Sequence, residues 1–566
     1  MEYYDLGSYS CPVSTSSPEA QVWFDRGLNW TYAFNHEEAV WCFEKAVEAD
    51  PNCAMAYWGI AYALGPNYNK PWEFFDAVDF ASTVQRTHSA VENGARIAGT
   101  HATAVEQELI AALGYRYPVD QVNPDGTTAE GCEIWNAQYA DAMRAVHQRH
   151  PGNLDVATLF ADALMNRTPW QLWDLETGEP APGSFALEIK SVLDGAIATE
   201  AGARHPGLLH MYIHLVEMST APEQGLVAAD RLRDIVPDGG HLHHMPTHLD
   251  VLCGDYRRVV SSNSAAILAD ERFLHRNGPM NFYTLYRSHD YHFKIYGAMF
   301  LAQRAVALET VAQMEVSIPE DLLRVQTPPM ADWLEGFLGM RVHVYIRFGM
   351  WQELIDMELP RDPDLYSATT AMIHYGRGVA HSATGRIAEA RQAREDFRAA
   401  LARVPESRTL FNNTCVDILA VASAMLDGEL LYREGDYDAA YEALRQCIDL
   451  SDHLPYDEPW GWMQPPRHAY GALLLEQGHV EEAARAYRAD LGLDDTVPRA
   501  CQHPNNVWAL HGYHECLQRL GRAEEANIIG KQLVLAAACA DVPITASCFC
   551  RTTAIDDPGA GPCCSA

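Results

Sequence analysis

Histidines concentrate in the middle of this chain, where ten of the 24 lie between residues 205 and 292. The first group is His210, His214 and Glu217, at positions i, i+4 and i+7, which share one face of an α-helix. Imidazoles and carboxylates are common transition-metal ligands, and a packed helix holds such ligands in fixed positions. This spacing predicts that the helix contributes part of a metal site.

Two further groups of histidines follow at helical spacing. In the first, Pro246 is expected to start a helix, so that His248 is helical and His241 to His244 lie in the turn that leads into it. The second is a pair at i and i+3. A single histidine on a helix is ordinary, whereas repeated pairs close in sequence indicate a shared site. We predict that six histidines converge, with His205, His241 and His243 beside them: His210, His214, His244, His248, His289 and His292.

The donor set of this cluster limits the metals it suits. Imidazole nitrogens suit zinc, copper, iron and nickel, whereas calcium and magnesium prefer oxygen. Three histidines for each of two ions would suit dioxygen binding between two coppers. Three histidines with open positions would equally make a hydrolytic zinc site or a mononuclear iron or copper site. The alternative to any metal is a hydrogen-bonded histidine cluster that lines a ligand cavity.

Candidate catalytic and substrate-binding residues lie in or near these motifs. Glu217, Tyr212 and Asp290 are the catalytic candidates, although helix packing is the ordinary role of such a tyrosine. Substrate binding is predicted for polar and aromatic residues in segments that precede or begin repeat helices, with turn and cap chemistry as the alternative. These residues are Asn67, Tyr68, Trp460, His468 and Trp508.

Small and aromatic residues recur at the offsets of the roughly 34-residue tetratricopeptide repeat. In the first copy a glycine lets the partner helix approach, and an alanine and a phenylalanine interlock with it. The pattern predicts an all-α, tetratricopeptide-like helical-hairpin solenoid, closed around a central cavity. The first copy comprises Ala20, Trp23, Gly27, Ala39, Phe43, Ala46 and Pro51, and similar offsets return between residues 378 and 526.

Four segments are predicted along the chain. Residues 1–116 hold N-terminal repeats with an inserted loop, and 117–300 hold degenerate helical repeats with the histidine cluster. Residues 301–540 hold C-terminal repeats, and 541–566 form a cysteine-rich tail. The tail carries Cys548, Cys550, Cys563 and Cys564, which could bind a metal or change redox state, with a loosely ordered tail as the alternative.

The charge balance excludes some partners. The chain has 41 basic and 76 acidic residues, a net charge of −35, so nucleic-acid binding is not expected. No stretch has the length and apolar character of a membrane-spanning helix, and the N-terminus lacks the pattern of a signal peptide. Cysteines scattered singly through helical segments fit a reducing compartment. We therefore expect a cytoplasmic protein without a membrane partner.

Five motifs lie at residues 30–39, 57–67, 205–214, 240–248 and 460–468. Together they resemble a family of tetratricopeptide-repeat proteins of uncharacterised activity found in bacteria and fungi. The resemblance implies the repeat fold. In the family pattern the position of His243 is commonly aliphatic, so the resemblance implies that His241, His244 and His248 are the functional histidines of their segment.

The sequence thus predicts a metal-dependent enzyme on a repeat scaffold, an oxidoreductase that acts on a small molecule through a copper or iron centre. A zinc-dependent hydrolase is one alternative. Another is a scaffold that binds a peptide or protein on its concave face. Peptide-binding arrays normally present Lys, Arg and Asn along the groove, whereas this chain gathers imidazole and aromatic groups in its middle third.

Overall fold

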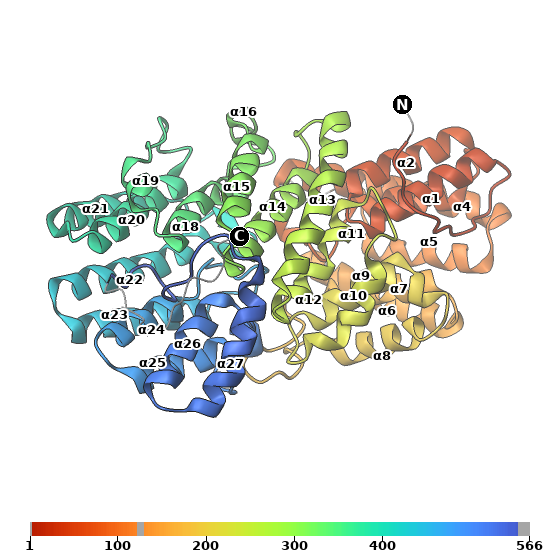
Figure 1. Cartoon of the computed structure of the whole chain (residues 1–566). Coiled ribbons are helices and arrows are strands. Elements are labelled where there is room, and N and C mark those ends of the chain that lie inside the picture. Colours follow the sequence, from red (N-terminus) through yellow and green to blue (C-terminus); the bar gives the residue numbers. More distant parts are fainter. Residues whose placement is uncertain (1–2, 122–128, 553–566) are drawn as a thin grey trace. The chain divides into compact units, whose positions relative to one another are not determined.

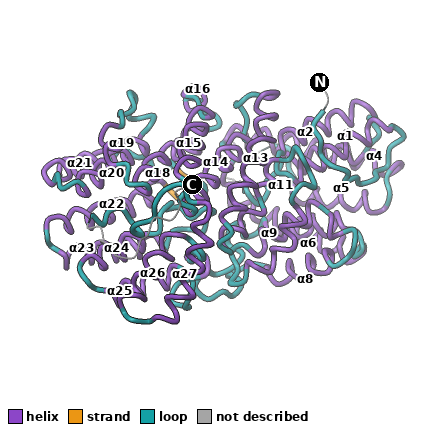
Figure 2. The backbone as a smooth tube through the Cα atoms, viewed as in Figure 1, coloured by secondary structure: helices purple, strands orange, loops and turns teal. Residues whose placement is uncertain are grey.

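Helices form almost all the regular structure in the residues that the computed structural model describes, 3–121 and 129–552 (Figure 1, Figure 2). Strands in these ranges are limited to one short antiparallel pair, β1 (Thr409–Leu410) and β2 (Asn413–Thr414). The prediction of an all-α array of tetratricopeptide-like helical hairpins is confirmed. Cys563 and Cys564 of the predicted tail lie outside the described residues.

The chain divides into two units. Unit 1 comprises Met1–Lys294, Val316–Ala331 and Pro498–Ala500, and unit 2 comprises Ile295–Glu315, Asp332–Val497 and Cys501–Ala566. Closure around a central cavity stays a prediction, as do the four segment boundaries. Within the described part of the chain, no helix is both long enough and apolar enough to span a membrane.

Unit 1 consists of helices that pack mainly against their neighbours in sequence, and it holds all the predicted metal ligands. Its α-helices are α1 (Pro18–Tyr32), α2 (His36–Ala49), α3 (Ala54–Leu64), α4 (Ala77–His101), α5 (Ala104–Arg116), α6 (Ala129–Arg149), α7 (Leu154–Met165), α8 (Ala186–Ile197), α9 (Pro206–Val216), α10 (Leu226–Leu232), α11 (Gly240–His244), α12 (Pro246–Leu252), α13 (Tyr256–Asn277) and α16 (Glu320–Leu323). Its 3-10 helices are η1 (Trp72–Phe74), η2 (Gly202–Arg204) and η3 (Pro222–Gly225).

Unit 2 repeats the hairpin plan. Its helices are η4 (Glu335–Gly339), α18 (Met340–Arg347), α19 (Trp351–Asp356), α20 (Ser367–Ala383), α21 (Ile387–Leu401), α22 (Cys415–Glu434), α23 (Tyr437–Asp452), α24 (Pro466–Glu476), α25 (Val480–Asp490), α26 (Val507–Arg519), α27 (Ala523–Ala536) and η6 (Ala537–Cys539). Four helices carry residues of both units: α14 (Tyr283–Phe300), α15 (Arg304–Ser317), α17 (Met330–Leu334) and η5 (Arg499–Cys501).

The first hairpin packs around Phe43, as the repeat pattern predicts. Phe43 is fully buried on α2. A Cβ on Gly27 of α1 would lie 2.6 Å from Phe43 Cε1, and one on Gly59 of α3 would lie 2.5 Å from Phe43 Cδ1. Both distances are shorter than van der Waals contact, so glycine at these two positions allows α1 and α3 to pack on the ring.

Gly27→Ala should therefore destabilise unit 1, by about 1–3 kcal/mol, because the added methyl overpacks the core. The matched control is Gly195→Ala on α8, where a Cβ would meet nothing within 4 Å. That substitution should stabilise the helix by about 0.5–1 kcal/mol, because alanine has the higher helix propensity. Urea denaturation followed by circular dichroism measures both. Equal effects of the two substitutions would contradict the packing described for Phe43.

Candidate metal centre

Helix α9 carries the first histidine pair. It begins at Pro206, and the preceding His205 caps it, because His205 Nδ1 accepts a hydrogen bond from the Leu208 amide at 3.2 Å. His205 thus starts the helix. His210 and His214 follow one turn apart on a single face.

The second set of histidines lies on two short helices, α11 and α12, joined at Met245. The sequence predicted a turn for His241 to His244, and the structure instead has a helix there. The difference arises at Met245, whose φ and ψ of −50° and −41° are helical, so the chain turns continuously into Pro246. Proline is tolerated at that first position because no intrahelical N–H is required. His244 and His248 therefore share one face.

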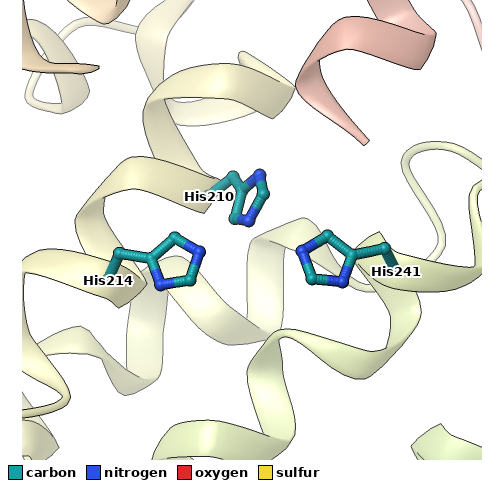
Figure 3. Close-up of side chains that lie close together, drawn as sticks. All are labelled: His210, His214 and His241. Carbon is teal, nitrogen blue, oxygen red and sulfur yellow. The ribbon is translucent and has the colours of Figure 1, made fainter. Parts of the chain in front are cut away.

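His210, His214 and His241 form what we call the first triad, and Figure 3 shows their rings facing a common point. Each offers a ligand nitrogen within 4.8 Å of the other two. None of the three residues is more than 1% exposed. Ligands of one tetrahedral ion, bound at about 2.0–2.1 Å, stand about 3.3 Å apart, so small side-chain rotations bring these nitrogens to ligating distance.

Hydrogen bonds fix which ring nitrogens face the centre. His210 Nδ1 lies 2.7 Å from the Tyr32 carbonyl oxygen, and His214 Nδ1 lies 2.8 Å from Glu217 Oε1. A carbonyl or carboxylate only accepts, so each Nδ1 carries the hydrogen and each Nε2 carries a lone pair. Both Nε2 atoms are buried and make no hydrogen bond in the described structure, and neither do the two ring nitrogens of His241. Metal-binding histidines are held in this way.

His244, His248 and His289 form the second triad, also within 4.8 Å of one another. His248 Nδ1 lies 2.7 Å from Glu217 Oε2, and His244 Nδ1 lies 2.7 Å from Asn263 Oδ1. Both Nδ1 atoms therefore carry hydrogen. The two Nε2 lone pairs then face each other at 2.8 Å, an unfavourable contact unless a cation lies between them. Two nitrogens bound at right angles to one ion would stand about 2.9 Å apart.

The orientation of Asn263 supports this assignment. Its Nδ2 donates to the Val259 carbonyl at 2.8 Å and to Thr247 Oγ1 at 3.2 Å. The amide oxygen therefore points at His244 and can only accept. Asn263 lies in the apolar stripe of α13 and is fully buried. Its role is to hold the His244 ring.

Glu217 connects the two triads. It is 1% exposed, and its two oxygens accept from His214 and His248. Burial raises the pKa of Glu217, and its hydrogen bond from His248 opposes that rise. These three residues also form a third group of potential ligands within 4.8 Å.

Burial keeps the six imidazoles of the two triads neutral. It lowers the pKa of three of these histidines to about 3, and it lowers the pKa of the other three well below the ordinary value of 6.5. Neutral imidazole is the ligating form, so protons do not compete for these lone pairs at neutral pH. The first three are His214, His244 and His248, and the others are His210, His241 and His289.

Aromatic rings enclose the triads. Phe34 lies 4.4 Å from His210 and stacks on His241 at 5.4 Å, and Trp170 lies 5.8 Å from His214, as ring-centroid distances. Phe34 and Trp170 have φ of 54° and 58°, in the left-handed region that is rare for bulky side chains. Backbone strain of this kind is retained where the surrounding structure imposes it. On the second triad, Phe293 stacks on His248 at 5.3 Å.

A pocket of about 290 Å³ reaches this aromatic layer. Phe34 lines the pocket and also contacts all three rings of the first triad. Phe34 therefore adjoins both the pocket and the histidines. Polar groups of Asn67, His36 and Lys70 line the same pocket.

Three further predicted site residues, Asp290, His292 and Tyr212, belong to neither triad. Asp290 is buried with its Oδ1 3.3 Å from His244 Nδ1, and its pKa is raised well above its usual range by burial and by neighbouring Asp270. His292 is buried, with its ring 6.2 Å from that of His289, and is not one of the second triad. Tyr212 points elsewhere, because a step of two residues from His210 reaches the opposite side of α9, and it lines a separate open groove.

The predicted substrate residues divide between the units. In unit 1, Tyr68 is fully buried with its ring 4.7 Å from that of His214, and Asn67 Nδ2 donates to His36 Nδ1 at 3.0 Å. Both therefore belong to the surroundings of the first triad. Their role in substrate binding stays a prediction.

In unit 2, the other three predicted substrate residues bond to neighbouring protein groups. The indole N–H groups of Trp460 and Trp508 donate to backbone carbonyls at 2.8 and 2.7 Å. His468 Nδ1 accepts from Arg347 at 3.1 Å, and its Nε2 lies 2.9 Å from Asp490. These bonds hold loops and helices together. Substrate binding by these residues likewise stays a prediction.

Sequence reasoning missed Phe34, Trp170 and Asn263 as parts of the centre. The sequence does indicate a role for Asn263, because a single amide side chain in an apolar helical stripe needs a buried hydrogen-bond partner. It gives no comparable indication for Phe34 and Trp170. Their rings reach the histidines from segments distant in sequence, through a backbone conformation that residue type does not predict.

Comparison with known proteins identifies the repeat. Residues 428–453 match the tetratricopeptide repeat family model. No curated protein matches the chain. The chain thus contains a tetratricopeptide repeat, in agreement with the hairpins described above.

The solved structures that are similar to the chain include the following three. The APC/C hetero-tetramer Cut9–Hcn1 gives a TM-score of 0.30 at 13% identity over 88% of this chain and 76% of that one. The structure of Naa15/Naa10 bound to HypK-THB gives a TM-score of 0.21 at 13% sequence identity, over 91% of this chain and 70% of that one. Yeast Tom70 gives a TM-score of 0.31 at 11% sequence identity, over 92% of this chain and 99% of that one. TM-scores this low support no inference about a shared function.

The metal-free protein should lose stability as the pH falls from about 7 to about 5. The folded-state pKa values of His214, His244 and His248 are about 3, below the ordinary 6.5. Below about pH 6.5 the unfolded chain therefore binds protons that the folded chain does not. Each such histidine contributes a slope of up to about 1.4 kcal/mol per pH unit.

Urea denaturation of chelator-treated protein across this range measures the slope. His214→Gln should make it shallower, and His275→Gln, which removes an exposed histidine of unit 1, is the matched control. A wild-type stability that does not change over this range would contradict the burial of neutral imidazoles.

Proposed function

We propose that the protein binds one or two transition-metal ions at the two histidine triads. One observation carries the proposal: His210, His214, His244 and His248 each have Nδ1 bonded to an acceptor, which places the lone pair on Nε2 in two rings of each triad. The ligand atoms of both triads are nitrogens, and the carboxylate of Glu217 lies within 4.8 Å of a ligand nitrogen of one histidine from each triad. Imidazole-rich sites of this kind suit copper, iron and zinc.

We further propose copper or iron before zinc, and an oxidoreductase reaction on a small molecule. Two three-nitrogen sites side by side fit a pair of redox ions, which would supply electron transfer when bound. The pocket beside Phe34 is the proposed approach for the small molecule, since Phe34 lines the pocket and contacts the first triad. A zinc hydrolase is the variant of this proposal that needs only one triad.

Metal analysis by inductively coupled plasma mass spectrometry of protein purified without chelators tests the centre. We expect one or two equivalents of metal in the wild type and none in His210→Ala/His248→Ala. The matched control His275→Ala should keep its metal. Glu217→Gln should weaken affinity by about 10–100-fold, because the carboxylate orients two ligands. Folded wild type that lacks metal and also takes up no added copper, iron or zinc would refute the proposal.

Phe34→Ala should speed both uptake and chelator removal of the metal while leaving its stoichiometry unchanged, because the ring both lines the pocket and contacts the first triad. Stopped-flow mixing with a coloured chelator measures the rate. Trp41→Ala, at an aromatic position 36% exposed on α2, is the control. Unchanged rates in Phe34→Ala would mean that ions reach the centre by another route.

The tetratricopeptide match favours a second function, the binding of a protein or peptide partner. Arrays of such repeats commonly present a surface for extended partners. This function concerns the scaffold and does not use the histidines. Partner capture that is equal for wild type and His210→Ala/His248→Ala would assign binding to the repeats alone.

A further inference from the structure

A second group of potential ligands or reactive side chains lies in unit 2, outside the histidine centre. Glu429 of α22 and the sulfurs of Cys548 and Cys550 lie within 4.8 Å of one another, and the two cysteines form a disulfide. Cys550 is fully buried, whereas Cys548 is partly exposed. One sulfur is thus accessible and the other is sheltered next to a carboxyl group.

This disulfide is not needed to hold the chain together. It joins residues only two apart, so the loop it closes is too small to restrict the unfolded chain much. The segment is held by other bonds. Ser547 donates to the His468 carbonyl at 2.9 Å, Arg551 donates to Glu515 at 2.8 Å, and Arg433 donates to the Cys550 carbonyl. The cysteines are thus presented by a segment that is anchored on both sides.

Glu429 is the unusual member of the group. It is 2% exposed, and its Oε2 makes no hydrogen bond in the described structure. A buried carboxyl oxygen without a donor is costly and calls for a chemical reason. Burial raises the pKa of Glu429 to about 7, with Arg433 opposing and Glu476 adding to the rise. The group therefore gains and loses a proton near neutral pH.

We propose that Cys548, Cys550 and Glu429 form a thiol–disulfide redox site whose reductant is a small thiol or dithiol. The thiolate of the reductant attacks Cys548 Sγ, the accessible sulfur, and the bond between the two cysteine sulfurs breaks. Cys550 leaves as a thiolate and takes the proton of Glu429. A second thiolate of the reductant then attacks the reductant sulfur of the mixed disulfide, and Cys548 leaves as a thiolate that takes one of the two protons released by the reductant thiols. Glu429 regains its proton from the other, so one disulfide is reduced, one is formed, and two electrons and two protons reach the protein.

The reverse reaction uses the same groups. Glu429 accepts the proton of the buried Cys550 thiol, and the resulting thiolate attacks Cys548 in a mixed disulfide. Proton transfer by a positioned carboxyl group typically accelerates such steps by about 100-fold or more. This inference is independent of the metal centre, because all three residues belong to unit 2.

The test measures disulfide opening in the full-length folded protein. The protein is incubated in glutathione buffers of graded ratio, alkylated, digested, and the peptide with Cys548 and Cys550 is quantified by mass spectrometry. We expect a reversible two-electron transition. Glu429→Gln should slow both reduction by dithiothreitol and reoxidation by about tenfold or more. Glu434→Gln, the same substitution on the same helix at a residue that pairs with Arg391, should leave both rates unchanged.

Two results would overturn the proposal. One is a wild-type pair that never forms the disulfide in these buffers and is protected from alkylation only by added zinc, which would assign the group to metal binding. The other is equal rates in Glu429→Gln and wild type, with circular dichroism showing both folded, which would remove Glu429 from the reaction.

Discussion

The carboxylate of Glu217 fixes the histidine centre, because its two oxygens accept hydrogen bonds from imidazoles of different triads. Burying a carboxylate is costly unless donors satisfy it, and the Nδ1–H groups of His214 and His248 do so at 2.8 and 2.7 Å. The same bonds set the tautomer of both rings. One residue therefore compensates its own burial, joins α9 to α12, and directs two Nε2 atoms into the interior.

The repeat scaffold gives that carboxylate rigid partners. Proline begins both α9 and α12, so the histidines stand at fixed places on short, fully buried helices. The Tyr32 carbonyl at the end of α1 fixes the His210 ring, and Phe34, two residues later, covers the triad with a left-handed backbone. The turn between the first two repeat helices thus has two roles, since it both connects the hairpin and closes the centre. A peptide-binding array needs only the first of these roles.

Helical periodicity in the sequence predicted which residues share a helix face and where the repeat hairpins lie. It did not predict contacts between side chains that are distant in sequence. Helical spacing was enough to place His210, His214 and Glu217 on one face, and the repeat offsets were enough to predict the hairpin around Phe43. The same geometry argues against grouping Tyr212 with them, since a residue two positions along a helix lies across it. The contacts of Phe34 and Trp170 with the histidines could not be predicted, because both residues lie in turns whose φ values are not determined by residue type. The roles of Trp460 and Trp508 were equally hidden, since only coordinates show an indole N–H meeting a backbone carbonyl.

The hydrogen-bond arrangement favours the proposed ligand centre over an ordinary buried histidine cluster. A cluster that served packing alone would satisfy both nitrogens of each ring, because an unmade buried hydrogen bond costs about 1–3 kcal/mol. Here Nδ1 of His210 and of His214 is bonded to an acceptor, while Nε2 of each makes no hydrogen bond in the described structure. The Nε2 atoms of His244 and His248, each assigned a lone pair, face each other at 2.8 Å. The proposed transition-metal ion would accept these nitrogen lone pairs and so remove the costs.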